Sequence, residues 1–180
     1  MNILEYFKKI HTFIFDVDGV FTDSGVLVLE DGKLLRRMNT RDGLAIKMAV
    51  EAGFKVVIIT GGKSNGVIER LKNLGVTDIY SGVDTKIDKY EEFLHVYDIS
   101  LEDEEGILYM GDDLPDYEVM RRVGLPSCPR DAAHEIINIS RYISPKNGGE
   151  GCARDVIEKV LKLKGKWLKE PDPYLGKLPK

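Results

Sequence analysis

The amino-acid sequence predicts an α/β fold, in which a doubly wound, mainly parallel, Rossmann-like sheet carries helices on both faces. Short apolar runs of β type alternate along the chain with amphipathic helical windows, a pattern typical of a parallel sheet covered on both sides. Polar residues recur where these runs end, and that edge is where open α/β sheets bind ligands. The sequence contains no internal repeat and no low-complexity tract.

The expected elements follow this alternation from the N-terminus onward. Apolar runs rich in β-branched and aromatic residues predict strands over 11–17, 54–60, 77–82, 106–112 and, more weakly, 124–129. Windows with helical periodicity lie between them, near 42–52, 64–74, 85–98, 113–123 and 131–139. A last helix is expected at about 151–164, where Val156, Val160 and Leu163 recur at near-helical spacing.

One segment interrupts this alternation directly after the first strand. Residues 25–38 contain two extended runs that flank Asp31-Gly32, and Asp-Gly is a strong hairpin signal. We therefore expect a β-hairpin that projects beyond the carboxyl end of the first strand. The C-terminal tail, about 165–180, is rich in Pro and Lys and is predicted to be mobile or to dock on a neighbouring molecule.

Length and composition limit the protein's class and partners. The 180 residues suit a single domain, and the net charge of −4 lacks the basic excess typical of nucleic-acid or anionic-membrane binding. No apolar stretch approaches the roughly 18–20 residues of a membrane span, and the N-terminus does not resemble a signal peptide. Two cysteines without metal-type spacing fit free thiols, so the cytoplasm is the expected compartment.

Chemically versatile residues follow several of the predicted strands. They are Asp16, Asp18, Thr60, Lys86, Asp112, Asp113 and Asp116. Single residues of these types are often helix caps or solvated loop residues. A set that recurs at successive strand ends instead predicts one shared crevice, because the carboxyl ends of parallel strands meet at one edge of the sheet.

The predicted crevice suits phosphoryl transfer. Asp16 and Asp112 supply the hard oxygen ligands that Mg²⁺ prefers, and a bound cation would offset the repulsion between clustered carboxylates. Lys86 offers a positive charge and Thr60 a hydroxyl to a phosphate group. Positioning and charge stabilisation of this kind carry most of the catalysis of phosphoryl transfer.

Four ordered motifs, FDVDGVFTD, IITG, the lysine of SGVDTK, and GDDLPD, resemble those of the haloacid dehalogenase superfamily of phosphatases. The resemblance implies that Asp16 attacks phosphorus and forms an aspartyl-phosphate, and that Asp18 is the general acid and base. It also implies Mg²⁺ held by Asp16, Asp112 and the main-chain carbonyl of Asp18, with Asp113 and Asp116 in support. The whole chain, 1–180, is then expected to be one phosphatase domain.

Superfamily members often close the crevice with a cap domain. Here only the hairpin occupies the first insertion point, and one helix and one strand fill the second, between Thr60 and Lys86. We therefore expect no cap domain, and expect a neighbouring subunit to exclude water from the site. The resemblance implies a homotetramer with active sites shared between subunits, in which the hairpin also serves in assembly.

A finer similarity covers about residues 11–158. The segments NTRDGLAIK, IERLKNLGV, YMGDDLPDYEVMRRVGL and GGEGCARDV are similar to bacterial 3-deoxy-D-manno-octulosonate 8-phosphate (KDO 8-phosphate) phosphatases of lipopolysaccharide biosynthesis. The similarity implies that the substrate, an acidic sugar phosphate, is bound by Asp18, Asn39, Thr40, Arg41, Asp42, Gly43, Lys47, Gly61, Arg70 and Lys86. Arg41 and Arg70 suit the sugar carboxylate, because arginine binds carboxylates through two parallel hydrogen bonds.

One position departs from the family pattern. After ITG the KDO 8-phosphate phosphatases commonly have arginine, whereas Gly62 and Lys63 stand here. Phosphatases of KDN 9-phosphate look like a Glu-Lys version of the same stretch, so KDN 9-phosphate and N-acylneuraminate 9-phosphate are the alternative substrates.

Two non-enzymatic interpretations compete with hydrolysis. Phospho-receiver domains also combine Asp, Thr and Lys around Mg²⁺, but they lack an acid two residues beyond the phosphorylated aspartate, where Asp18 stands. A catalytically silent binding protein would not need every reactive motif residue to be present.

Overall fold

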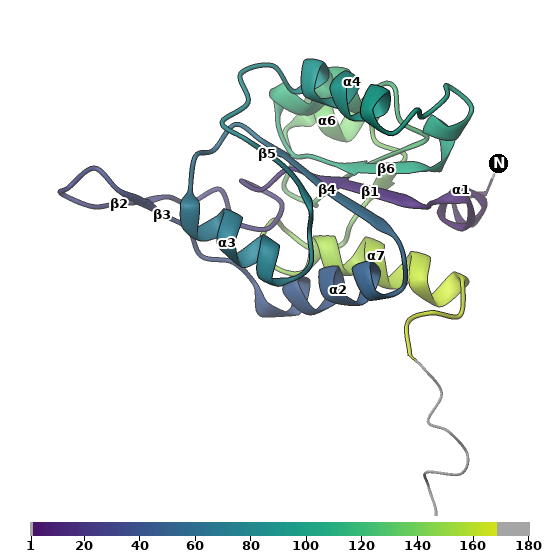
Figure 1. Cartoon of the computed structure of the whole chain (residues 1–180), viewed down its shortest axis with the longest axis horizontal. Coiled ribbons are helices and arrows are strands. Elements are labelled where there is room, and N and C mark those ends of the chain that lie inside the picture. The colour runs from purple at the N-terminus through teal and green to yellow at the C-terminus, as the bar shows by residue number, and fades with distance from the viewer. Residues whose placement is uncertain (1, 169–180) are drawn as a thin grey trace, which may run out of the picture.

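The computed structural model describes residues 2–168, so most of the predicted tail lies outside the described part. Its main sheet has six parallel strands in the order β5-β4-β1-β6-β7-β8 (Figure 1). They are β1 (Thr12–Phe15), β4 (Lys55–Thr60), β5 (Asp78–Ser81), β6 (Ile107–Met110), β7 (Leu125–Cys128) and β8 (Tyr142–Ile143). From β1 the chain runs outward through β4 and β5 and returns to β6 on the other side of β1. This reversal confirms the predicted doubly wound sheet.

Helices cover both faces of the sheet because its central strands are apolar on both sides. Phe13 and Phe15 of β1 pack into one buried cluster, and Ile14 packs into the other. The Phe13 face is covered by α1 (Ile3–Lys9), α2 (Thr40–Glu51), α3 (Asn65–Asn73) and α7 (Cys152–Leu163), and the Ile14 face by α4 (Lys86–Val96), α5 (Tyr117–Met120) and α6 (His134–Ile139). Within residues 2–168, no helix combines the length and apolar character that crossing a membrane requires.

Three elements differ from the expectations. Helix α1 and strand β8 were not expected, and the helix expected over 113–123 is wrong in extent. That segment contains a 3₁₀ turn, Leu114–Asp116, followed by the single turn of α5. The carboxylate of Asp116 accepts the backbone N–H groups of Asp112 at 3.1 Å and Asp113 at 3.4 Å, so the chain folds around this side chain before any regular helix begins.

The predicted hairpin is present as a separate two-stranded sheet, β2 (Leu27–Val28) and β3 (Leu34–Leu35). Gly32 in its turn has a φ of +82°, the left-handed conformation that glycine adopts without steric cost. The hairpin extends away from the sheet near the N-terminus of α3 (Figure 1). Its apolar side chains are unusually exposed to solvent: Leu27 is 63% exposed and Val28 is 66% exposed. The segment between Thr60 and Lys86 contains only α3 and β5 and therefore no cap domain.

Helix α7 is capped by a side chain from another helix. Its N-cap residue, Gly151, has no side chain, and Asp42 of α2 accepts the backbone N–H of Arg154 at 2.7 Å instead. Asp42 is buried, and its Oδ2 has no hydrogen-bond partner among the described residues. Burial raises the pKa of Asp42 to about 6, against the opposing effect of the Arg154 N–H. This contact fixes α2 against α7.

Asp42→Asn should remove a pH dependence of folding stability. Because the pKa of Asp42 is higher in the folded state than in the unfolded state, Asp42 contributes fully to the free energy of unfolding below its unfolded pKa, near 3.8. That contribution is lost as pH rises through about 6. Wild type should therefore lose on the order of 2–3 kcal/mol across that window, and the variant should keep it. Urea unfolding at about pH 4 and about pH 7 measures the difference. Equal pH slopes for both proteins would contradict this assignment.

Candidate active site

The predicted reactive residues meet at the carboxyl edge of the sheet. Asp16 directly follows β1, Thr60 ends β4, Lys86 begins α4, and Asp112 follows β6. Together with Asp18 they line one pocket of about 340 Å³. The sheet therefore brings together residues that are up to 96 positions apart in the sequence, from Asp16 to Asp112. The shared crevice predicted from the strand ends is present.

A buried lysine links two carboxylates at the base of this pocket. Lys86 Nζ lies 2.7 Å from Asp16 Oδ2 and 2.7 Å from Asp116 Oδ1. Burial lowers the pKa of Lys86, but the charges of Asp16 and Asp116 outweigh that effect and raise it above its usual value. Asp116 also accepts the hydroxyl of Tyr109 at 2.6 Å. Lys86 is thus a fixed, charged group rather than a mobile one.

Asp16 is held in a single orientation. Its Oδ1 accepts the backbone N–H of Val17 at 2.6 Å, while Oδ2 faces Lys86. Burial and then the charge of Asp116 raise the pKa of Asp16 to about 6, and Lys86 acts in the opposite direction. Burial, followed by the charges of Asp16 and Asp116, raises the pKa of Asp112 to about 8. Burial and the charge of Asp116 therefore oppose ionisation of both Asp16 and Asp112.

This geometry fits a divalent cation. One carboxylate oxygen each from Asp16, Asp112 and Asp116 lies within 4.8 Å of the others. Asp116 already accepts four hydrogen bonds, from Lys86, from Tyr109 and from the backbone N–H groups of Asp112 and Asp113. Asp16 has two such donors, Val17 N–H and Lys86, and the Asp112 carboxylate accepts none among the described residues, so these two have lone pairs left for a metal. A cation between these two would favour their ionised forms, against the burial and the neighbouring negative charges that raise their pKa values.

Asp18 lies at the rim of the pocket and forms a two-pronged ion pair. Arg36, just after β3, places Nε 2.7 Å from Asp18 Oδ1 and Nη2 3.0 Å from Oδ2. Sequence reasoning missed Arg36. The only signal in the sequence was a pair of arginines in an apolar hairpin. In the structure the two side chains differ in burial: that of Arg36 is 6% exposed, whereas that of Arg37 is 87% exposed and pairs with Asp23.

Comparison with known proteins identifies the family. No protein-family model matches the chain. It is 34% identical, over 165 residues, to the 3-deoxy-D-manno-octulosonate 8-phosphate phosphatase KdsC of Escherichia coli strain K12, covering 92% of this chain and 86% of that protein. The chain belongs to the KDO 8-phosphate phosphatase family. The resemblance predicted from the motifs is confirmed.

Solved structures of KDO 8-phosphate phosphatases share the fold. The enzyme from Yersinia pestis superposes with a TM-score of 0.87 at 32% identity, covering 92% of this chain and 88% of that chain. The enzyme from Moraxella catarrhalis, in complex with magnesium ion, phosphate ion and KDO, superposes with a TM-score of 0.86 at 31% identity, covering 92% and 93%. A Legionella pneumophila neighbour is described as a putative haloacid dehalogenase superfamily hydrolase, with a TM-score of 0.86 at 30% identity.

The other substrate contacts implied by the family lie mostly outside the Asp16 pocket. Gly61 lines that pocket, whereas Asn39, Thr40, Arg41, Asp42, Gly43, Lys47 and Arg70 do not. Asn39 caps α2 through the N–H of Arg41 and donates to the carbonyl of Gly149 at 3.1 Å. Asp42 is buried under α7, and Lys47 lies 3.8 Å from Glu51 on the surface of α2. Their roles in binding stay predictions.

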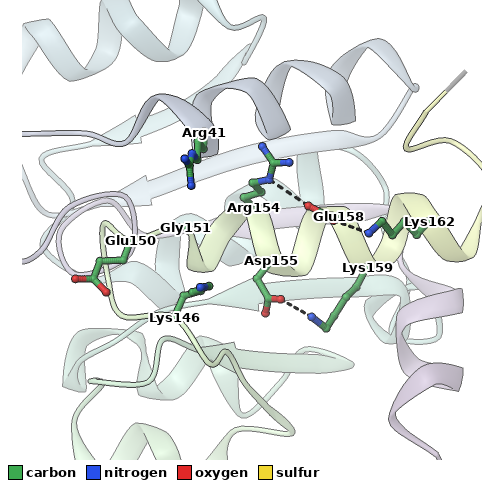
Figure 2. A pocket seen from close by; sticks show the side chains of 9 residues that line it. All are labelled: Arg41, Lys146, Glu150, Gly151, Arg154, Asp155, Glu158, Lys159 and Lys162. Atoms are coloured by element: carbon green, nitrogen blue, oxygen red, sulfur yellow. Dashed lines mark hydrogen bonds and ion pairs between the residues drawn. The ribbon is translucent and has the colours of Figure 1, made fainter.

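Two family arginines lie in different surroundings. Arg70 of α3 contacts α2 at Gly43, where an added Cβ would lie 2.8 Å from its Nη2. Arg41 lines a second pocket, of about 360 Å³, over α7, with Lys146 and Arg154 among its neighbours (Figure 2). Within one copy of the chain, neither arginine lines the pocket of Asp16.

Asp112→Asn should separate repulsion from metal binding. Because the pKa of Asp112 is higher in the folded state, Asp112 contributes to the free energy of unfolding below its unfolded pKa, near 3.8. That stabilisation is lost as pH rises through about 8. Without metal, at about pH 8.5, the variant should therefore melt several degrees above wild type. Mg²⁺ at about 100 times its Kd should raise the wild-type Tm by roughly 5–10 °C and the variant's much less.

The matched control is Asp88→Asn, which changes an exposed aspartate in the first turn of α4. It should retain the full Mg²⁺ response. A full Mg²⁺ shift in Asp112→Asn would show that this carboxylate is not a ligand.

Proposed function

We propose that the chain is a Mg²⁺-dependent phosphoric monoester hydrolase that converts KDO 8-phosphate to KDO and phosphate in cytoplasmic lipopolysaccharide biosynthesis. The observation that carries the proposal is the oriented carboxylate of Asp16, held by Val17 N–H and Lys86 beside Asp112, in a member of this family. An anionic nucleophile next to a fixed ammonium group and a predicted metal site suits attack on a phosphate dianion.

The proposed reaction has two steps. An oxygen of Asp16 attacks phosphorus, the bond from phosphorus to the sugar oxygen breaks, and Asp18 gives its proton to that oxygen. Asp18 then takes a proton from water, whose oxygen attacks phosphorus and releases Asp16. Lys86 and Thr60 hold the phosphoryl oxygens during both steps. Mg²⁺, held by Asp16, Asp112 and the carbonyl of Asp18, would supply neutralisation of the phosphoryl charge.

A substrate panel tests this function. The ratio kcat/KM should be at least about 10-fold higher for KDO 8-phosphate than for KDN 9-phosphate or N-acylneuraminate 9-phosphate, because pocket contacts that discriminate one substrate commonly contribute 1–3 kcal/mol. EDTA should abolish turnover, and Mg²⁺ should restore it.

Asp16→Asn should lower kcat by at least about 1,000-fold while remaining folded, because it removes the nucleophile.

The panel includes the nine-carbon substrates because Gly62 and Lys63 depart from the sequence that is common in KDO 8-phosphate phosphatases. The Lys63 side chain lies along Gly82 after β5, where a Cβ on Gly82 would be 2.6 Å from Lys63 Cε. A preference for a nine-carbon substrate would overturn the KDO assignment. A phosphorylated protein that lasts for hours without turnover would instead favour the phospho-receiver interpretation.

We propose further that the enzyme is a homotetramer with active sites shared between subunits. Two features support it: most of the predicted substrate contacts lie outside the Asp16 pocket of their own chain, and the hairpin exposes Leu27, Val28, Leu34 and Leu35. Exposed apolar patches on soluble proteins commonly mark association surfaces. A neighbouring subunit would also exclude water from an uncapped site.

Val28→Lys should weaken this assembly and lower kcat/KM for KDO 8-phosphate by about 10-fold or more, because a charge would be buried in the interface. Sedimentation velocity and steady-state kinetics at matched concentrations measure both effects. Leu101→Lys, at a loop residue that is 80% exposed, is the control and should change neither. A fully active monomer would contradict the shared-site proposal.

A further inference from the structure

The contact between Arg36 and Asp18 is unusual for a residue of a projecting hairpin. The Arg36 side chain is 6% exposed and that of Asp18 is 32% exposed, so the ion pair at the rim of the pocket is largely shielded from solvent. Among residues 2–168, the Asp18 carboxylate has no hydrogen-bond partner other than Arg36. The orientation of Asp18 in the structure therefore depends on one guanidinium group.

The end of β4 has the shape that admits this guanidinium. A Cβ on Gly62 would lie 3.0 Å from Arg36 Nη2 and 3.0 Å from Asp18 Oδ2, closer than side chains normally approach. Gly62 N–H is bound to Thr60 Oγ1 at 3.2 Å, which fixes the backbone at that position. Gly62, where this chain departs from the family sequence, therefore leaves room for Arg36 and Asp18 because it has no side chain.

One nitrogen of Arg36 remains unused. Nη1 is buried and has no acceptor within the described part of the chain. A buried donor without a partner is unfavourable, and a guanidinium kept for packing or surface charge alone would be expected to have its donors satisfied or solvated. The guanidinium itself lies against Asp18 and Gly62, which both line the pocket that contains Asp16.

We propose that Arg36 is a positioning residue for Asp18, and that Gly62 provides the room in which it acts. This inference rests on the proposed role of Asp18 as general acid and base. Nε fixes Asp18 Oδ1, at the shorter of the two contacts. Oδ2 gives up its contact with Nη2 and carries the proton that passes to the leaving sugar oxygen. In the second step Oδ2 accepts a new proton from the attacking water.

A series of aryl phosphates with leaving groups of increasing pKa tests this role. A poor leaving group needs the proton from Asp18, whereas 4-nitrophenolate leaves without it. Arg36→Ala should lower kcat/KM by about 3-fold for 4-nitrophenyl phosphate but about 50-fold for phenyl phosphate, which steepens the dependence on leaving-group pKa. Arg36→Lys should restore part of the loss. Arg37→Ala, the exposed neighbour on the hairpin, should follow the wild-type line.

Gly62→Ala supplies a second test that leaves the arginine in place. Its Cβ should shift the two side chains of the ion pair by a few tenths of an ångström. The same dependence should therefore steepen by a smaller amount, about 5-fold at phenyl phosphate. The matched control is Gly66→Ala in α3, where an added Cβ meets nothing within 4 Å. This control should match wild type throughout the series.

The outcomes separate this inference from the proposed function. A loss that is equal for all leaving groups in Arg36→Ala and Gly62→Ala would show a merely structural role and overturn the inference, whether or not KDO 8-phosphate is the substrate. Hydrolysis of aryl phosphates with the expected steepening, but no hydrolysis of KDO 8-phosphate, would overturn the proposed substrate and support the role of Arg36.

Discussion

The ion pairs of Lys86 with Asp16 and Asp116 are the interaction on which the rest of the site depends. Moving each charge out of water costs several kcal/mol, and the two contacts of 2.7 Å to Lys86 offset part of that cost. With Asp112 ionised, three carboxylates face one ammonium group and leave a net charge of −2. A dication would balance that charge. The same cluster therefore holds three strand ends together and favours a metal.

Close packing around these carboxylates explains the glycines of the two acidic motifs. A Cβ on Gly19 would lie 1.9 Å from Asp112 Oδ2, and a Cβ on Gly111 would lie 2.3 Å from Asp116 Cγ. Gly19 also has a φ of +80°, which other residues rarely adopt. The chain can bring these acidic groups so close only because the facing backbone carries no side chain.

The sequence predicted the sheet, its reversal and the residues at the strand ends, because those features follow from apolar periodicity and from the geometry of parallel strands. Periodicity carried no information about contacts between distant segments. Arg36 reads as one of two similar hairpin arginines until the fold buries it. Asp42 reads as part of a binding motif, yet it caps a helix more than 100 residues away, at Arg154. Asp116 delays the start of the helix expected over 113–123, because its carboxylate binds the backbone N–H groups of Asp112 and Asp113.

The hairpin joins the two proposals physically. Strand β3 is followed directly by Arg36, which is buried against Asp18, while Leu27 and Val28 on the other strand are mostly exposed. A two-stranded hairpin is only marginally stable in water by itself, so its position is easily biased by whatever covers its apolar side chains. A subunit that packs there would also fix Arg36, and through Arg36 the carboxylate of Asp18. Assembly would then act on proton transfer rather than only on access to the pocket, because the residue that orients the acid belongs to the element that the neighbour holds.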